Sequence, residues 1–357
     1  MTVLLLSRYA SLGASSRVRF YQYLPALRAH GIEVTVAPLL PDEYLSSLYA
    51  GRSAPWPRLV AAGIRRLATL LRSQRFDLLW IEGEALPWWP FALERLAQPR
   101  GVPSVIDYDD AIFHRYDSHR SSVVRRFLGR KIDETMRHAA IVVAGNEYVA
   151  ARARAAGTRR VEILPSAVDP EHHRPLRPVD APGCRIGWIG SPITAPYLEP
   201  LRGVFQRMSL GRKVEVTLIG APAGTLTDVG ARVRPWREAT EVEDLNTVDV
   251  GIVPVPDRPF ERGKCGFKVV QYMACGRAVI ASPVGANRQI IEHGVNGLLA
   301  DGEREWEEAL RLLCARPDLR RSLGEAGRRT VVSRYSTAVV LPRLVQVLEE
   351  AAATRLR

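Results

Sequence analysis

Short apolar runs alternate with longer amphipathic segments along the whole chain, which is the pattern of an α/β protein. The first run, Val3–Leu6, leads through a loop of small residues into Arg17–His30, where apolar side chains recur at helical spacing. Gly31 ends this helix, and Ile32–Ala37 is the next apolar run. A strand, a helix and a second strand in this order predict a parallel sheet.

The alternation continues along the chain and divides into two series. Pro165–Pro182 separates them; it is rich in proline and has no periodic pattern, which predicts a linker. The further strands are predicted at Asp77–Ile81, Val102–Asp107, Ile141–Ala144, Val161–Leu164, Arg185–Ile189, Val214–Ile219, Val250–Val253 and Ala278–Ala281. The further helices are predicted at Leu59–Leu71, Pro90–Ala97, Val124–His138, Tyr148–Ala156, Pro196–Arg207, Phe267–Ala274, Asn287–Glu292, Glu303–Ala315, Asp318–Val332 and Val339–Ala353.

Size and charge narrow the classes of protein. A chain of 357 residues with 46% hydrophobic content is long enough for two ordinary domains. The net charge of +12 favours anionic partners such as nucleotides, sugar diphosphates, nucleic acid or an acidic membrane. No basic segment with interleaved aromatics and no finger-type Cys/His spacing occurs, which argues against nucleic acid. Four scattered cysteines without a C-x-x-C pair lead us to expect no disulfide and a cytoplasmic location.

Two segments that follow predicted strands carry candidate chemistry, because ligands of α/β sheets bind beyond the carboxyl ends of strands. Gly13, Ser15 and Ser16 lie in a loop of small residues whose backbone can approach a phosphate; the alternative is an ordinary turn. Asp107–Asp110 contains three acids, which suit a general base, a metal ligand or an orienting group; the alternative is a helix cap. His114, four residues on, is more often a structural histidine.

The third segment, Glu261–Gly276, combines glycines with cations. Gly263 and Gly266 allow a tight turn, and Lys264 and Lys268 bring positive charge to the predicted start of a helix. Cations are unfavourable at a helix start unless an anion binds there, so the pattern favours a phosphate site over a solvated basic helix start. Gln271 lies three residues after Lys268, on nearly the same face of the helix.

The same segment resembles the donor-binding signature of the retaining family 4 glycosyltransferases. The resemblance is carried by V-V-Q-Y-M-A-C-G-R-A-V-I-A-S-P-V-G-A-N from Val269 to Asn287, and by I-I-E-H-G-V-N-G-L-L from Ile290. The strand Asp249–Pro254 is similar to the D-x-x-x-x-P strand of that family. Together with Asp107–Asp110, the K-C-G-F-K-x-x-Q-Y-M-A-C-G sequence resembles one branch of the family.

The resemblance implies a GT-B fold, with two Rossmann-like domains whose parallel sheets face each other across a cleft. The N-terminal, acceptor-binding domain is then expected at residues 1–170, and the C-terminal, nucleotide-sugar-binding domain at residues 171–335. Residues 336–357 are expected to form a helix that crosses back to the first domain. Neither a cofactor nor a metal ion is expected, and the oligomeric state stays open.

The resemblance also implies roles for single residues. Gln271 and Gly263 stand where the family has its two signature glutamates, which contact the donor ribose and the donor sugar. The backbone at Gly266 and Phe267 is expected to face the sugar and the diphosphate. The residues expected at the diphosphate from the first domain and at the nucleobase are Gly13, Ser15, Ser16, Arg234 and Trp236.

A further departure from the family concerns positive charge. The family's Arg/Lys pair after the first strand of the second domain is absent, and Gly187–Thr194 stands there. Our hypothesis is that Lys264 and Lys268 supply the missing charge as catalytic groups that stabilise the departing diphosphate. The leaving phosphate would itself take the acceptor proton, and Asp109 or Asp110 would orient the acceptor or the donor sugar.

The predicted function is therefore retaining transfer of a sugar from a nucleotide-sugar to a glycan, a lipid-linked or a small-molecule acceptor. The alternative is a non-catalytic sugar-nucleotide-binding subunit, because both signature glutamates are replaced. Arg52–Arg75 contains six arginines and no acid, and apolar residues lie between them. This mixture suits a peripheral contact with the inner, anionic face of a membrane; the alternative is a solvated helix face.

Overall fold

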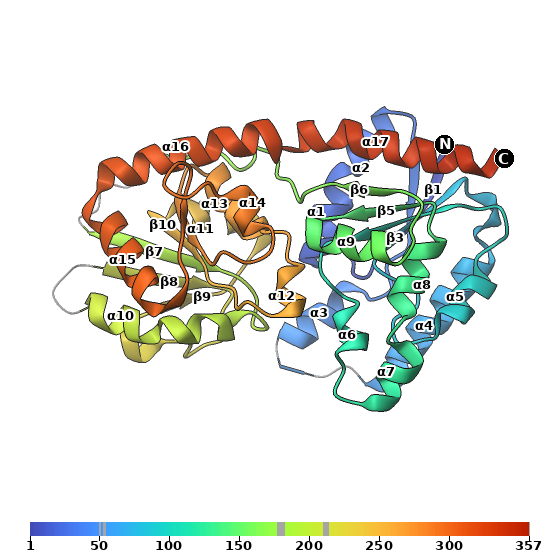
Figure 1. Cartoon of the computed structure of the whole chain (residues 1–357), viewed down its shortest axis with the longest axis horizontal. Helices are drawn as coiled ribbons and strands as arrows, with labels where there is room; N and C mark the ends of the chain where they lie inside the picture. The colour runs from blue at the N-terminus through green and yellow to red at the C-terminus, as the bar shows by residue number, and fades with distance from the viewer. Residues whose placement is uncertain (50, 53–54, 177–182, 210–213, 357) are drawn as a thin grey trace. The chain divides into compact units, whose positions relative to one another are not determined.

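The computed structural model describes residues 1–49, 51–52, 55–176, 183–209 and 214–356, which form two compact α/β units (Figure 1). Unit 1 comprises Met1–Ser166, Arg262–Cys265 and Val340–Arg357, and unit 2 comprises Ala167–Glu261 and Gly266–Val339. Arg262–Cys265, which lies inside the predicted C-terminal domain, therefore clusters with unit 1. Residues 177–182 of the predicted linker are outside the described residues.

The described part of unit 1 is built on a six-stranded parallel sheet, as the βαβ pattern predicts. The strands are β1 (Thr2–Leu6), β2 (Glu33–Val36), β3 (Leu78–Glu82), β4 (Ser104–Tyr108), β5 (Ile141–Ala144) and β6 (Val161–Ile163). They lie in the order β2-β1-β3-β4-β5-β6, with Val3 opposite both Val34 and Leu78. The chain order reverses between β1 and β3, the position where ligands typically bind in open α/β sheets.

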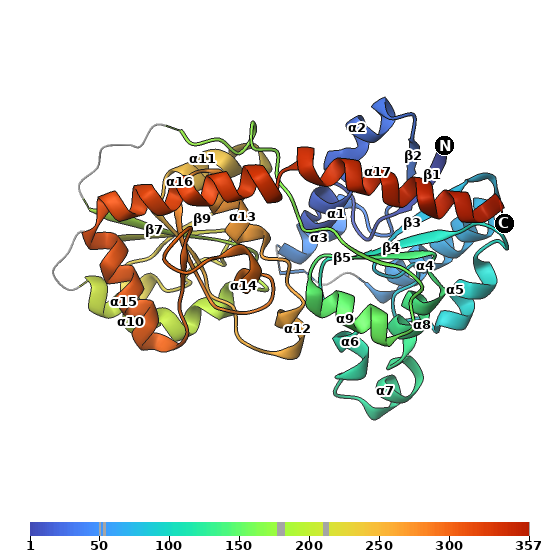
Figure 2. The ribbon, with the colours of Figure 1, turned by 45° about the horizontal axis from the view of Figure 1, so that its top comes forward.

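The helices of unit 1 cover both faces of this sheet. They are α1 (Ala14–Arg19), α2 (Leu24–Ala29), α3 (Asp42–Tyr49), α4 (Trp56–Leu71), α5 (Phe91–Ala97), α6 (His114–Asp117), α7 (Ser122–Leu128), α8 (Lys131–His138), α9 (Glu147–Ala155) and most of α17 (Thr337–Ala353). Figures 1 and 2 show α4, α5, α8 and α9 on one side of the sheet and α17 on the other. Arg343 of α17 is hydrogen-bonded to Glu162 of β6, which ties the last helix to unit 1.

Two helices that the sequence predicts as continuous are broken. The predicted helix Arg17–His30 divides at Phe20 because Pro25, which has no backbone N–H, occupies the first turn of α2. The predicted helix Val124–His138 divides at Gly129, between α7 and α8. Apolar periodicity does not register either break.

The described part of unit 2 is also a six-stranded parallel sheet, with the order β12-β11-β10-β7-β8-β9. Its strands are β7 (Cys184–Ile189), β8 (Val214–Ile219), β9 (Arg232–Arg234), β10 (Val250–Val253), β11 (Ala278–Ala281) and β12 (Leu298–Leu299). The predicted strands are confirmed, but β9 and β12 were not predicted. They have three and two residues, which is too short for a periodic pattern.

Two layers of helices enclose the sheet of unit 2. The helical elements are η3 (Ala195–Leu201), α10 (Arg202–Ser209), α11 (Glu241–Asn246), α12 (Pro259–Arg262), α13 (Phe267–Ala274), α14 (Asn287–Ile290), α15 (Gly302–Ala315) and α16 (Pro317–Arg334). Apolar side chains of α10 and α15 pack in one core, and those of α11, α13 and α16 pack in another. Figure 1 shows α10 and α15 on one side of this sheet and α13 and α16 on the other.

One expectation about the cysteines is wrong. Cys184, the first residue of β7, and Cys314, in the last turn of α15, form a disulfide. Both belong to the same core of unit 2, and their Cα atoms are 5.2 Å apart although 130 positions separate them in the chain. Cysteine spacing cannot reveal such a pair, because the fold alone brings it together. Cys265 and Cys275 are buried free thiols.

Candidate functional site

In unit 2, a glycine fixes the start of α13 at the carboxyl edge of the sheet. Gly266 has a left-handed backbone with φ of +67°, and a Cβ there would lie 2.5 Å from the Cδ1 atom of Ile290. Only glycine fits this conformation without strain. The first turn of α13 follows directly, so backbone N–H groups and the positive end of the helix dipole lie next to Phe267 and Lys268.

The Lys268 ammonium group reaches the end of strand β7. Its Nζ atom lies 4.6 Å from the ring centroid of Trp188 and 3.3 Å from the hydroxyl of Thr194. A Cβ atom on Gly190 would lie 2.7 Å from the same Nζ, so glycine leaves the room that the ammonium group occupies. Lys268 thus places a cation at the strand end where the family's Arg/Lys pair is missing.

Gln271, one turn after Phe267, has a buried hydrogen-bond donor without a partner among the described residues. Its side chain is 3% exposed, and its amide nitrogen Nε2 has no hydrogen-bond partner among the described residues. Leaving such a buried donor unpaired costs about 1–3 kcal/mol. This unpaired donor lies on the helix that carries Lys268.

The two residues predicted at the nucleobase lie at the end of β9: Arg234 is its last residue, and Trp236 follows two residues later. A Cβ on Gly220, at the end of β8, would lie 2.1 Å from the carbonyl oxygen of Gly190 and 3.1 Å from the Cβ of Trp236. These contacts bring Trp236 next to the end of β7, near Lys268. The Trp236 indole N–H donates to Glu241 at 2.9 Å, which fixes the half-buried ring. Arg234 is more exposed and forms an ion pair with Asp244 at 3.0 Å.

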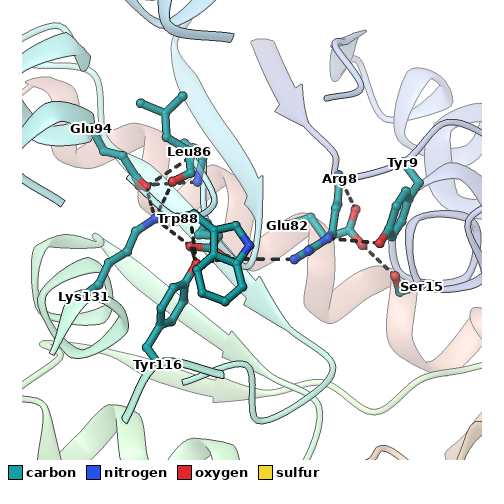
Figure 3. Close-up of polar contacts among 11 residues, drawn as sticks. Arg8, Tyr9, Ser15, Glu82, Leu86, Trp88, Glu94, Tyr116 and Lys131 are labelled. Carbon is teal, nitrogen blue, oxygen red and sulfur yellow. Dashed lines mark hydrogen bonds and ion pairs between the residues drawn. The ribbon is translucent and has the colours of Figure 1, made fainter. Parts of the chain in front are cut away.

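In unit 1, Glu82 organises the loop of small residues. The hydroxyls of Ser15 and Ser16 donate to its carboxylate at 2.7 and 2.6 Å, and the backbone N–H of Arg8 donates at 2.7 Å (Figure 3). Burial raises the pKa of Glu82. Both predicted serines therefore anchor the loop through their side chains, and the loop backbone is what remains for a ligand. Gly13 precedes α1, where a Cβ would lie 2.4 Å from that of Tyr9.

The three acids at the end of β4, Asp107 within the strand and Asp109 and Asp110 after it, have different surroundings, so they do not form one cluster. Asp107 is buried and accepts two hydrogen bonds from Arg19, at 2.9 and 3.0 Å, which gives it a structural role. The backbone carbonyl of Asp109 accepts a hydrogen bond from the Cys265 thiol at 2.7 Å. Asp110 lies 3.7 Å from the Nζ atom of Lys264. The protein around Asp110 raises the pKa of its carboxyl to about 6, although Lys264 opposes that rise.

The segment Arg262–Cys265 is seated closely on unit 1. The carbonyl oxygen of Lys264 accepts a hydrogen bond from the side chain of Asn146 at 3.1 Å. A Cβ atom on Gly263 would lie 2.4 Å from the Cβ of Ala111, so a larger residue does not fit there. Lys264 therefore faces a carboxylate in unit 1, whereas Lys268 lies on α13 of unit 2. The sequence groups the two lysines, and the structure gives them different neighbours.

Comparison with known proteins places these features in a family. The family model "Glycosyltransferase Family 4" matches residues 17–172, and the model "Glycosyl transferases group 1" matches residues 202–316. The first match spans the elements of unit 1 from α2 to β6, and the second spans those of unit 2 from α10 to α15, including α13, which carries Lys268 and Gln271. The chain belongs to glycosyltransferase family 4.

Individual relatives of this family 4 member are distant. D-inositol 3-phosphate glycosyltransferase of Thermobispora bispora is 29% identical over 166 residues, which are 42% of this chain and 37% of that protein. The chain thus matches less than half of the length of that relative. Among solved structures, Anabaena Alr3699/HepE in complex with UDP has a TM-score of 0.70 at 16% identity, covering 98% of this chain and 100% of that one. Sucrose-phosphate synthase from Thermosynechococcus elongatus has a TM-score of 0.73 at 16% identity, covering 99% of both. These structures confirm the GT-B fold.

A cluster of buried polar side chains around Lys131, just after β3, was not predicted from the sequence of this family 4 member (Figure 3). Glu84 accepts hydrogen bonds from the hydroxyl of Tyr116 and from Lys131, whose ammonium also lies 2.9 Å from Glu94. His114 is bonded to Asp117 and Tyr148, in keeping with a structural histidine. Three or more His, Cys, Asp or Glu side chains placed to hold a metal ion do not occur in the described parts of the chain.

Proposed function

We propose that the chain transfers a sugar from a nucleotide-sugar donor to an acceptor hydroxyl with retention at the anomeric carbon. One observation carries this proposal: α13 bears both the Lys268 cation and the buried amide of Gln271, whose Nε2 atom has no hydrogen-bond partner among the described residues. Membership of family 4 supports it. A related fold has been solved with UDP-glucose bound, in Anabaena Alr3699/HepE, so UDP-glucose is the first donor to test.

The donor is proposed to bind along the carboxyl edge of unit 2. The N–H groups at Gly266 and Phe267, together with Lys268, would hold the diphosphate and stabilise the negative charge that develops on it. Gln271 would bind the ribose, which gives its Nε2 atom an acceptor. Trp236 would stack on the base, with Arg234 beside it.

Unit 1 is proposed to take part through backbone and carboxylate groups. The loop at Gly13, held by Ser15, Ser16 and Glu82, would offer backbone N–H groups to the diphosphate. Asp110 and Asp109 would orient the reacting hydroxyl, with Lys264 favouring the ionised form of Asp110. Gly263 would contact the donor sugar through its backbone. The departing phosphate would accept the proton of the acceptor hydroxyl.

The proposal is tested by a transfer assay with UDP-, GDP- and dTDP-sugars. Several relatives are D-inositol 3-phosphate glycosyltransferases, so inositol 3-phosphate and inositol belong among the acceptors. Lys268→Ala should lower turnover by about 100-fold or more if Lys268 stabilises the departing charge. Arg207→Ala, which removes a surface cation paired with Glu303 and Glu307, is the matched control. Unchanged turnover in Lys268→Ala would refute the assignment.

A second candidate is a sugar-nucleotide-binding subunit without catalysis. The observation in its favour is that Gly263 and Gln271 replace both glutamates of the family signature. Ligand binding to the folded state raises the melting temperature, so a thermal-shift screen with the same donors detects binding independently of turnover. Binding of a donor without transfer or hydrolysis under any condition would favour this second function.

We also propose that α4 contacts an anionic membrane surface. Its exposed apolar residues Trp56, Val60, Ile64 and Leu71 recur at helical spacing. Exposed arginines lie beside them on the same helix, at positions 58 and 65. This combination suits a helix in the plane of a membrane interface. No described helix is long and apolar enough to span a membrane.

Sedimentation with liposomes tests the membrane contact. The protein should bind vesicles that contain phosphatidylglycerol and dissociate at high salt, and Ile64→Ser should weaken binding more than Leu96→Ser. Leu96, on α5, is an exposed apolar control at 80% exposure. Equal recovery in the supernatant with and without anionic lipid would exclude the contact.

A further inference from the structure

Trp88, in the loop after β3, has an unusual backbone conformation for a large residue. Its φ is +68°, in the left-handed region that favours glycine. Such a conformation costs about 1–3 kcal/mol and persists only where the surroundings enforce it. The side chain does not repay this cost by burial, because 51% of Trp88 is exposed.

Buried side chains bond the backbone of the turn that carries Trp88, at Trp88 itself and at Leu86 (Figure 3). The hydroxyl of Tyr116 accepts the backbone N–H of Trp88 at 3.0 Å and donates to Glu84. Lys131, fully buried, bonds Glu84 at 2.6 Å and also donates to the carbonyl of Leu86. The turn that presents Trp88 is therefore part of a rigid network beneath the surface.

The indole ring rests on its neighbours through edge contacts. Its centroid lies 5.1 Å from that of Tyr116, at an interplanar angle of 66°, and 5.8 Å from that of His119, at 75°. Aromatic rings in such tilted pairs support one another without being covered. The result is a fixed and half-exposed indole surface.

Trp88 is also placed where a ligand binds in this type of sheet. The loop follows β3, next to β1, at the point where the strand order reverses. Arg8, which follows β1, extends its guanidinium to within 3.9 Å of Glu84, and 21% of its side chain is exposed. The indole ring of Trp88 and the guanidinium group of Arg8 thus lie at the same edge of the unit 1 sheet.

We infer that Trp88 is the platform on which a polyhydroxylated ring of the acceptor, a sugar or a cyclitol, stacks at the carboxyl edge of unit 1. The inference rests on the proposed function and names its acceptor class. The C–H groups on one face of such a ring are apolar and pack on indole, while its hydroxyls remain free for hydrogen bonds. Arg8 provides N–H donors for hydroxyl or phosphate groups of the same ligand.

Saturation-transfer NMR on the full chain, saturated with UDP, tests the platform. The probes are methyl α-glucopyranoside, myo-inositol and inositol 3-phosphate. At least one should receive saturation at its ring protons, and Trp88→Ala should weaken that binding about tenfold, the scale of one aromatic contact. Trp88→Tyr should retain most of the binding. Phe127→Ala, which removes an aromatic side chain of unit 1 at 72% exposure, should leave it unchanged.

Each other outcome overturns the inference. If Trp88→Ala bound the probes as tightly as the wild type, Trp88 would not be the platform. If no probe bound the wild-type chain, sugars and cyclitols would be excluded as the ligand class. Trp88→Gly should melt at a higher temperature than Trp88→Ala, because both lose the ring and only glycine adopts the left-handed backbone without strain, and a lower melting temperature would show that this backbone is not strained. A thermal-shift screen with UDP-, GDP- and dTDP-sugars on the same samples separates the two proposals. A shift with any of these donors, while Trp88→Ala binds the acceptor probes normally, refutes the platform alone, and no shift with any of them refutes the proposed function.

Discussion

The buried Lys131 cluster allows the effect of one substitution to be worked out. The Nζ atom of Lys131 is completely buried, 2.6 Å from a carboxylate oxygen of Glu84 and 2.9 Å from one of Glu94. Lys131→Met keeps an unbranched side chain, one atom shorter, and removes the ammonium group with its charge and its hydrogen bonds. Two carboxylates then remain in a buried site without their common cation, and burial already raises the pKa of Glu94 in the native protein.

Two estimates of the free energy of unfolding that Lys131→Met removes give similar values. Removing one partner of a buried ion pair typically destabilises a protein by about 3–5 kcal/mol. Alternatively, the cluster takes up one proton to replace the lost charge. At pH 7 this protonation costs about 3.7 kcal/mol, because the ordinary pKa of a glutamate is about 4.3 and one pKa unit corresponds to about 1.36 kcal/mol. We therefore expect a loss of about 4 kcal/mol at pH 7.

The second estimate also fixes the pH dependence. The folded variant holds a proton that its unfolded chain releases above about pH 4.3, so its stability falls as the pH rises. The deficit relative to the wild type should therefore shrink by about 1.4 kcal/mol for each pH unit between 7 and 5. Urea unfolding of the variant and the wild type at pH 5, 6 and 7 measures this deficit.

A surface pair provides the control. Arg154→Met removes a cation that is 52% exposed and paired with Glu147, and it should cost at most about 1 kcal/mol at any of these pH values. The reasoning fails if Lys131→Met is as stable as the wild type at pH 7. It also fails if its deficit stays constant as the pH falls, because the two carboxylates would then not be ionised in the native cluster.

Three further predictions follow from single groups. Because the pKa of Asp110 is raised to about 6, the transfer rate should fall as the pH is lowered through 6, and the slower Asp110→Asn variant should lack this step. A pH profile with the same step in both proteins would contradict this. Alkylation of the unfolded, unreduced chain should label two cysteines, and four after reduction; four without reduction would exclude the Cys184–Cys314 bond. Gln271→Leu should raise the melting temperature of the free protein and reduce the shift caused by UDP-glucose, and an undiminished shift would argue against a ribose contact.

The sequence predicted the fold well because the central strands are nearly continuous apolar runs. β5, β10 and β11 have the predicted bounds, since their side chains are buried and their ends are marked by loops, and the half-buried β8 also has its predicted bounds. The helix from Arg17 was not predicted correctly, because one proline and a short 3-10 turn divide it without changing its apolar pattern. Local pattern therefore predicts the presence of an element better than its continuity.

The candidate site was less predictable, because its contacts join residues far apart in the chain. Ser16 and Glu82 are 66 positions apart, and Glu84 and Lys131 are 47 positions apart. Neither glutamate stands in a motif, so their partners could only be identified in the folded chain. Asp107–Asp110 shows the converse: acids that are neighbours in the sequence have different partners, Arg19 for Asp107 and Lys264 for Asp110.

The buried acids of unit 1 are neutralised from separate elements, and this arrangement explains how the edge supports a strained residue. Asp107 in β4 pairs with Arg19 of α1, and Glu84 after β3 pairs with Lys131 of α8, so the end of β4 and the loop after β3 are each fixed by a helix. Because the loop after β3 is fixed, Trp88 cannot leave its left-handed conformation for a less strained one. Lys131→Met should therefore weaken acceptor binding even at pH 5, where most of its stability returns, because a proton restores neutrality but not the hydrogen bond to Leu86.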